Sequence, residues 1–263
     1  MTYQLHQQDC LEWMATQPDQ SVDCVLTSPP YDNIRHYNGY TFDFESTASE
    51  LVRLLAPGGV IVWNAADATV NGSESGTSMR QALHFISLGL RLHDTMIYVK
   101  RNPMPTNVRT RRYHQAWEYL FVLSKHLPRV FNPILVNAKY SGVALMKYRG
   151  QDGTLTYKKT PRNAQTKLRN VFEYTIGGGH TTQNKQLSQH PALMPEQLAL
   201  DQLQTWADAT SVIYDPFAGA GTTLWAAEQL GFSSVGTEID ADYCNLTHKR
   251  MLCEASPPFP PKR

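Results

Sequence analysis

Short apolar runs alternate with longer, partly amphipathic stretches along most of this chain. The runs predict β-strands at residues 22–26, 60–63, 96–99, 119–123, 212–214 and 234–236. The stretches predict helices at residues 45–55, 79–88, 195–207, 222–230 and 241–253, some of which carry apolar residues three and four positions apart. Strands that alternate with helices are typical of an α/β fold, in which helices cover both faces of a sheet.

The periodicity lapses between residues 127 and 189. Glycines cluster at residues 177–179, and basic residues dominate the segment. We therefore expect an irregular region inside an otherwise regular fold. A chain of 263 residues is long for one domain, but α/β folds of this length are common and can bury a large core.

The net charge of +1 hides a strong separation of charge along the chain. Residues 100–169 hold fifteen Lys and Arg against two acids, a net charge of +13 that leaves −12 for the rest. This suits a protein that grips phosphates in one cleft, whereas the alternative is a solvated basic face. The candidate phosphate contacts, which a nucleic acid would supply, are Arg109, Arg111, Arg112, Lys147, Arg149, Lys158, Lys159 and Arg162.

Targeting and metal-binding signals are weak. No apolar run approaches the roughly 18 residues that span a bilayer, and the polar start is no signal peptide, so we expect a cytoplasmic protein without membrane contact. The four cysteines lack the spacing of a zinc site or a disulfide scaffold, and we expect them to pack in the core and no metal to bind.

Residues 27–31, Thr-Ser-Pro-Pro-Tyr, follow the first predicted strand. Two prolines fix φ and remove two backbone donors, so the carbonyls of Ser28 and Pro29 are free to face a ligand. The loop is stiff and rich in acceptors, and its aromatic residue suits a flat base. A proline turn that only closes the strand is the alternative.

A second motif lies at residues 214–223, Tyr-Asp-Pro-Phe-Ala-Gly-Ala-Gly-Thr-Thr, between a predicted strand and a predicted helix. Gly219 and Gly221 permit a tight turn and close approach of a ligand to the backbone. The third glycine of the dinucleotide fingerprint is missing and no Gly-Lys-Ser/Thr occurs, which argues against NAD and nucleoside triphosphates. Glu238 ends the next strand, where an acid can accept hydrogen bonds from ribose hydroxyls.

Together these motifs resemble the S-adenosylmethionine-dependent amino-methyltransferases of DNA, which modify cytosine N4 or adenine N6. The Ser-Pro-Pro-Tyr loop precedes the glycine loop, which is the permuted order of the β class. Four further segments resemble the same class, at residues 57–63, 118–125, 170–173 and 190–195 with Leu198. The resemblance thus spans nearly the whole chain.

The resemblance implies a circularly permuted, Rossmann-like methyltransferase sheet with helices on both faces. Residues 1–126 would form its catalytic half, 127–189 a target-recognition region and 190–263 its cofactor-binding half. The catalytic residues would be Ser28, Pro29, Pro30 and Tyr31. S-adenosylmethionine would be held by Asp9, Cys10, His190, Pro191, Met194, Asp215, Phe217, Gly219, Gly221, Thr222, Thr223 and Glu238, although Asp9 and His190 could instead be a helix cap and a turn residue.

The expected chemistry explains the loop composition. An exocyclic amine is a poor nucleophile because its lone pair is delocalised into the ring. Acceptors at both amine hydrogens, the Ser28 side chain and the Pro29 carbonyl, would localise that lone pair and aim it at the methyl group. The target base must leave the duplex, and Tyr31 would stack on it.

Ser28, where most N6-adenine members carry aspartate, favours N4-cytosine, with N6-adenine as the alternative. C5-cytosine methylation is set aside because no Pro-Cys dipeptide occurs. A protein-amide or RNA methyltransferase and a non-catalytic DNA-binding module are remoter alternatives. The expected partners are double-stranded DNA and a cognate restriction endonuclease, for a monomer or homodimer of prokaryotic or phage origin.

Overall fold

The chain folds into two compact units, Met1–Asn132 with Asn170–Arg263, and Pro133–Arg169. The computed structural model describes residues 3–30, 42–106, 109, 111–177, 180–182, 184, 187 and 193–253. Among the described residues, the larger unit holds the central sheet and all the α-helices. The smaller unit is built from paired strands.

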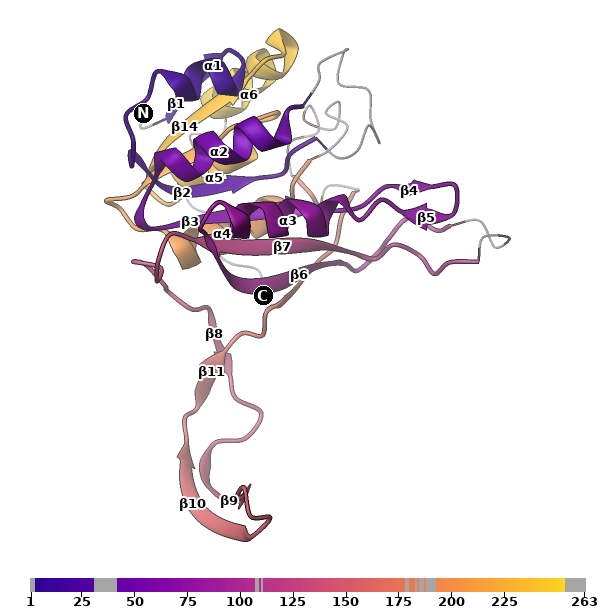
Figure 1. The fold of residues 1–263 in the computed structure, drawn as a ribbon, viewed down its shortest axis with the longest axis vertical. Coiled ribbons are helices and arrows are strands. Elements are labelled where there is room, and N and C mark those ends of the chain that lie inside the picture. Colours follow the sequence, from indigo (N-terminus) through magenta and orange to yellow (C-terminus); the bar gives the residue numbers. More distant parts are fainter. Residues whose placement is uncertain are drawn as a thin grey trace. The chain divides into compact units, whose positions relative to one another are not determined.

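In the described residues of the larger unit, eight strands form one sheet (Figure 1). Each strand runs parallel to its neighbours, except that β7 is antiparallel to both β3 and β6. The spatial order is β1 (Tyr3–Gln7), β14 (Ser233–Glu238), β13 (Val212–Asp215), β2 (Val22–Thr27), β3 (Leu55–Ala65), β7 (Trp117–Ser124), β6 (Arg91–Lys100) and β12 (Val171–Tyr174).

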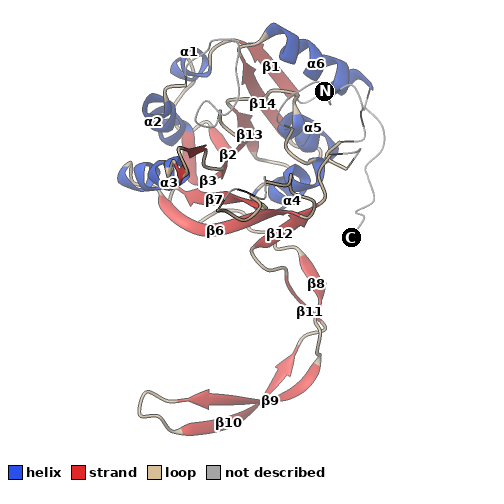
Figure 2. Ribbon diagram, turned by 90° about the vertical axis from the view of Figure 1, so that its right-hand side faces the viewer, coloured by secondary structure: helices blue, strands red, loops and turns tan. Residues whose placement is uncertain are grey.

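Helices cover both faces of this sheet, which confirms the predicted α/β fold. One face carries α1 (Cys10–Ala15), α2 (Phe44–Leu54) and α3 (Thr77–Ser87), and the other carries α4 (Glu196–Trp206), α5 (Thr222–Gln229) and α6 (Ala241–Cys253) (Figure 2). Each strand and helix predicted from the sequence overlaps one of these elements. No helix in the described ranges combines the length and the apolar character that a membrane crossing requires.

The connections place a topological switch point between β13 and β2. From β13 the chain runs through α5 to β14, toward the β1 edge, whereas from β2 it runs through α2 to β3, toward the opposite edge. Because α5 and α2 lie on opposite faces (Figure 2), the paired strands β13 and β2 end where open α/β sheets form a crevice. Ligands of open α/β sheets bind at such a point.

The core between α1, α2 and the sheet is rich in aromatic side chains. Trp63 and Phe85 are fully buried, with ring centroids 5.2 Å apart, and the Trp63 indole N–H donates to Gln81 Oε1 at 2.9 Å. Trp13 of α1 stacks on Tyr214 of β13 at 4.7 Å. The stacked pair packs the short helix α1 against β13, the strand at which the second motif begins.

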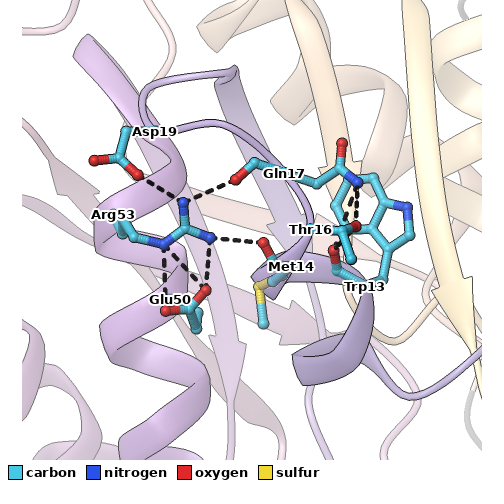
Figure 3. Close-up of polar contacts among 7 residues, drawn as sticks. All are labelled: Trp13, Met14, Thr16, Gln17, Asp19, Glu50 and Arg53. Atoms are coloured by element: carbon cyan, nitrogen blue, oxygen red, sulfur yellow. Dashed lines mark hydrogen bonds and ion pairs between the residues drawn. The ribbon is translucent and has the colours of Figure 1, made fainter.

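Arg53 joins α2 to the end of α1 (Figure 3). Its guanidinium donates to the carbonyls of Met14 at 2.6 Å and Gln17 at 2.9 Å, and it pairs with Asp19 and Glu50 at 2.7 Å each. It thereby adds charged donors to two carbonyls at the end of α1. The position of α1 relative to α2 is thus held by a charged network as well as by packing.

The smaller unit corrects the expectation that residues 127–189 are irregular. Here β8 (Leu135–Asn137) pairs with β11 (Gln165–Lys167), and β9 (Gly142–Arg149) pairs with β10 (Leu155–Arg162), both antiparallel. Residues 171–174 belong instead to the central sheet, where β12 pairs with β6. The larger unit also has a small hairpin of β4 (Thr69–Val70) and β5 (Ser73–Glu74).

Candidate active site

The carboxyl ends of β2 and β13 are joined by a hydrogen bond. The Thr27 hydroxyl donates to Asp215 Oδ1 at 2.7 Å, and the backbone N–H of Phe217 donates to the same oxygen at 3.1 Å. Both side chains are buried. Burial raises the pKa of Asp215 to about 6, and the hydrogen bonds offset only part of that effect.

The glycine loop after β13 is held from behind by α6. Gly219 and Gly221 have φ of 52° and 71°, and the Thr247 hydroxyl donates to the Gly219 carbonyl at 2.8 Å. A Cβ at position 221 would lie 2.5 Å from Thr247 Cγ2, closer than packing allows. The loop therefore requires glycine both for its conformation and for its contact with α6.

Arg250 of α6 supports the same loop. Its side chain is 1% exposed, and Nη1 donates to the Ala220 carbonyl at 3.2 Å and to Thr222 Oγ1 at 3.1 Å. Nη2 pairs with Glu196 of α4 at 2.7 Å, while the guanidinium lies 4.8 Å from the Trp225 ring centroid. A buried cation with these partners ties the loop to two helices.

Glu238, at the end of β14, bridges the glycine loop and the following turn. Its Oε2 accepts from the Gly219 N–H at 2.8 Å, and its Oε1 accepts from the Asp240 N–H at 2.9 Å. Burial raises its pKa, partly offset by these two bonds. Each carboxylate oxygen keeps acceptor capacity for a ligand, since an ionised carboxylate has about four acceptor sites.

Asp9 and Cys10 begin α1 beside β14. Asp9 Oδ1 accepts from the Leu11 N–H at 2.8 Å and so caps the helix. Burial, followed by the charge of Asp9, raises the pKa of the Cys10 thiol to about 12. The thiol stays protonated at neutral pH, so Cys10 serves packing and shape and is a poor candidate nucleophile.

These loops enclose a cavity of about 390 Å³ at the switch point. Twelve of the predicted site residues line it: Asp9, Cys10, Ser28, Pro29, Pro30, Met194, Asp215, Phe217, Gly219, Thr222, Thr223 and Glu238. Gly221 is not among the lining residues and supports the loop from the side of α6. Tyr31, His190 and Pro191 lie outside the described residues.

The cavity also includes residues that the sequence reading missed. Phe42 and Phe217 form an edge-to-face pair with ring centroids 5.1 Å apart, and Thr47 reaches the cavity from α2. Ile239 and Asp240 line it directly after Glu238. Their position next to the predicted acid is a usable sequence signal, whereas Phe42 and Thr47 become neighbours of the glycine loop only through the fold.

The predicted DNA-contact residues fall into both units. Arg109 and Arg111 of the larger unit are exposed, while Arg112 forms an ion pair with Glu74 of β5 and donates to the Gly72 carbonyl at 3.2 Å. Its charge is thus partly matched within the protein. The smaller unit carries the others, all exposed, on β9 and β10: Lys147, Arg149, Lys158, Lys159 and Arg162. No cluster of three or more His, Cys, Asp or Glu suited to a metal ion occurs among the residues that the structure describes.

Comparisons with known proteins identify the family of this chain. A family model described as DNA methylase matches residues 22–249. The orphan methyltransferase M.BamHII of Bacillus amyloliquefaciens is 41% identical over 245 residues, which cover 89% of each chain.

Two solved structures are similar across nearly the full length. The PvuII DNA methyltransferase, described as cytosine-N4-specific, has a TM-score of 0.70 at 18% identity and covers 97% of this chain and 88% of its own. The complex of M1.HpyAVI with S-adenosylmethionine (SAM) has a TM-score of 0.64 at 23% identity, covering 94% and 99%. At these identities the likeness shows a shared fold.

Proposed function

Because this chain belongs to the N6/N4 DNA methylase family and is an S-adenosylmethionine-dependent DNA amino-methyltransferase, we propose that it methylates the exocyclic N4 amine of cytosine. One observation carries the proposal. Ser28 and Pro29 line the same cavity as Asp215, the glycine loop and Glu238, so an amine held by the first group lies next to a ligand held by the second.

The cavity fits the cofactor in size and chemistry. Its volume of about 390 Å³ falls in the usual range of small-molecule sites. The buried carboxylate of Asp215 suits the ammonium group, Glu238 suits the ribose hydroxyls, and Phe217 offers an apolar surface. When bound, S-adenosylmethionine supplies an electrophilic methyl group.

The chain itself supplies orientation. Ser28 Oγ and the Pro29 carbonyl accept the two amine hydrogens, which localises the nitrogen lone pair and directs it into the cavity. The backbone of Pro29 and Pro30 is stiff because both φ angles are fixed by the rings. No general base acts before attack, because the amine becomes acidic only after methylation, and its surplus proton is then released to water.

Ser28 supports cytosine as the target. In the family that this loop resembles, serine before Pro-Pro-Tyr mostly accompanies N4-cytosine, whereas aspartate mostly accompanies N6-adenine. Adenine N6 is the second candidate, since its amine presents the same two hydrogens. In either case the base leaves the helix, because its amine is paired inside the duplex. We assign Tyr31, which lies outside the described residues, as the ring on which the extruded base stacks.

The test is methylation of plasmid DNA with labelled S-adenosylmethionine, followed by mass spectrometry of the nucleosides. We expect N4-methylcytosine as the labelled product. Labelled N6-methyladenine would overturn the choice of base, and an unlabelled pool would overturn the proposed reaction.

Single variants test whether the Ser28 side chain takes part in methyl transfer. Ser28→Ala should reduce kcat at least tenfold while the Kd for S-adenosylmethionine stays within about twofold of the wild type. Ser49→Ala is the matched control, because it removes an exposed hydroxyl of α2 that bonds only the helix carbonyl of Glu45, at 2.9 Å. Equal activity in both variants would remove Ser28 from the reaction. A restriction endonuclease partner and a monomeric or dimeric state stay predictions.

A further inference from the structure

The two long strands of the smaller unit, β9 and β10, form an antiparallel ribbon (Figure 2). The residues on its two faces differ in exposure and character. Their register pairs odd-numbered with odd-numbered residues, for example Lys147 with Tyr157 and Leu145 with Lys159. Because paired side chains share a face and alternate along a strand, one face holds the odd-numbered residues of 143–149 and 155–161. We call this the odd face and the opposite one the even face.

The odd face is bare. All of its residues are exposed, including apolar side chains: Val143 is 73% exposed, Leu145 64% and Tyr157 60%. The even face is partly covered, since Met146 is half-buried and accepts a contact from Arg162 Nη2 to its Sδ at 3.2 Å. An isolated two-stranded ribbon is marginally stable in water. Apolar side chains without cover on one face therefore indicate a surface that a partner covers.

Charge identifies the class of partner. The odd face carries Lys147, Arg149 and Lys159 and no acid, in a stretch that the structure describes throughout. Residues 133–169 hold eight basic residues and a single acid, Asp152, for a net charge of +7. A second copy of this chain would bring like charges together across a twofold axis. When these cations bind a polyanion such as DNA, they displace the counterions condensed on it, and the release of those counterions favours binding.

We propose that the odd face enters the major groove of double-stranded DNA. The groove is about 12 Å wide and admits a two-stranded ribbon, whereas the minor groove is about 6 Å wide. Lys and Arg match guanine O6 and N7, and apolar side chains such as Leu145 match the thymine methyl group. The inference rests on the DNA substrate of the proposed function and does not depend on which base is methylated.

The first experiment measures binding to a duplex that carries the mapped methylation site, over a range of salt. Lys147→Gln with Lys159→Gln should lower affinity for this duplex and reduce the slope of log K against log salt, because cations held in the groove displace counterions from the DNA. Lys158→Gln with Arg162→Gln removes the same charge from the even face and should change the slope less. Lys139→Gln with Lys167→Gln is the control off the ribbon. An equal effect of all three pairs would overturn the assignment of the odd face.

Dimethyl sulfate footprinting on the same duplex identifies the groove, because the reagent modifies guanine N7 in the major groove and adenine N3 in the minor groove. The wild type should protect guanine N7 positions that the Lys147→Gln, Lys159→Gln variant leaves reactive. Unchanged N7 protection, or loss confined to adenine N3, would overturn the groove assignment. Methyl transfer by the wild type, measured in parallel, separates failure of this inference from failure of the proposed reaction.

Discussion

Asp215 is a buried carboxylate at a site proposed to bind a cation, so its protonation state should control cofactor affinity. Its pKa of about 6 means that the acid becomes neutral as the pH falls through 6. Affinity for S-adenosylmethionine should therefore drop as the pH is lowered from 8 to 5. Calorimetric titration across this range measures the effect. Asp215→Asn should bind S-adenosylmethionine weakly, and its affinity should change little between pH 8 and pH 5. A flat wild-type profile would remove Asp215 from the ammonium site.

The same pKa predicts a cost in stability without ligand. A carboxyl group whose pKa rises from 3.8 to about 6 on folding stabilises the fold below pH 3.8, and this contribution is lost as the pH rises through 6. At about 1.36 kcal/mol per pH unit, ionised Asp215 costs up to about 3 kcal/mol at pH 8. The Thr27 hydroxyl and the Phe217 N–H both donate to Oδ1, so the amide oxygen of an asparagine can retain these two bonds.

Asp215→Asn should accordingly raise the free energy of unfolding at pH 8 more than at pH 5, as measured by urea denaturation without cofactor. Asp242→Asn, at an exposed position in the first turn of α6, is the matched control. An equal gain at both pH values would contradict the assignment. A variant that is more stable yet binds the cofactor poorly is expected when a functional residue is kept although burying its charge lowers stability.

The backbone conformation and the close contact at position 221 both require glycine. Gly221→Ala should destabilise the protein by about 2 kcal/mol or more, because alanine is strained at positive φ and its Cβ meets Thr247 Cγ2. Adding Thr247→Ser removes Cγ2 and keeps the hydroxyl that donates to Gly219. The double variant should regain part of the unfolding free energy in urea titrations. No recovery would show that backbone strain alone sets the cost.

At the scale of elements, the sequence predicted the strands and loops that build the candidate site. The ends of β2 and β13 follow buried apolar runs, and Gly219 with Gly221 marks the turn that follows β13. The element α1 was missed because six residues are too few for a helical period to show, and β1 because its residues are largely polar. Phe42 enters the cavity through tertiary packing, which no local pattern encodes.

The ribbon of the smaller unit was missed for a different physical reason. A strand is recognised when one face is buried and hydrophobic residues alternate with polar ones. In β9 and β10 apolar and basic residues share the odd face, as Leu145 and Lys159 do, so the pattern carries no clear period. The segment that appeared irregular in the sequence is regular antiparallel β-structure. Its residues are mostly exposed, so no buried hydrophobic face imposes an alternating pattern on it.

Helix α6 holds the glycine loop in place through Arg250. Replacing Arg250 should therefore reduce both the stability of the protein and its affinity for the cofactor. Arg250→Met should cost about 3 to 5 kcal/mol, because Glu196 is left with a largely buried charge. Adding Glu196→Gln removes that charge and should restore part of the loss. Urea denaturation of both variants measures this, and cofactor affinity should stay reduced because Ala220 and Thr222 lose their donor. A double variant no more stable than the single one would show that the ion pair is not the source.

At the scale of the whole molecule, two compact units divide the proposed work. The larger unit contains every described residue of the cavity, and the smaller one carries the exposed ribbon. Cofactor binding and DNA binding should therefore be separable. The ribbon can be deleted between Ala138 and Ala164. The Ala138 N–H donates to the Ala164 carbonyl at 2.8 Å, so these two residues are close enough to be joined by a short turn.

Replacing residues 139–163 by a short Gly-Ser turn should remove the ribbon without opening the core, since residues 142–162 are exposed apart from the half-buried Ala144, Met146 and Thr160. We expect the Kd for S-adenosylmethionine to stay within about twofold, because no residue of the cavity is changed. Affinity for the duplex should fall at least tenfold, since about six phosphate-binding cations are lost. Loss of cofactor binding together with DNA binding would show that the larger unit depends on the ribbon for its own fold, and retained duplex affinity would place the DNA contacts on Arg109 and Arg111 instead.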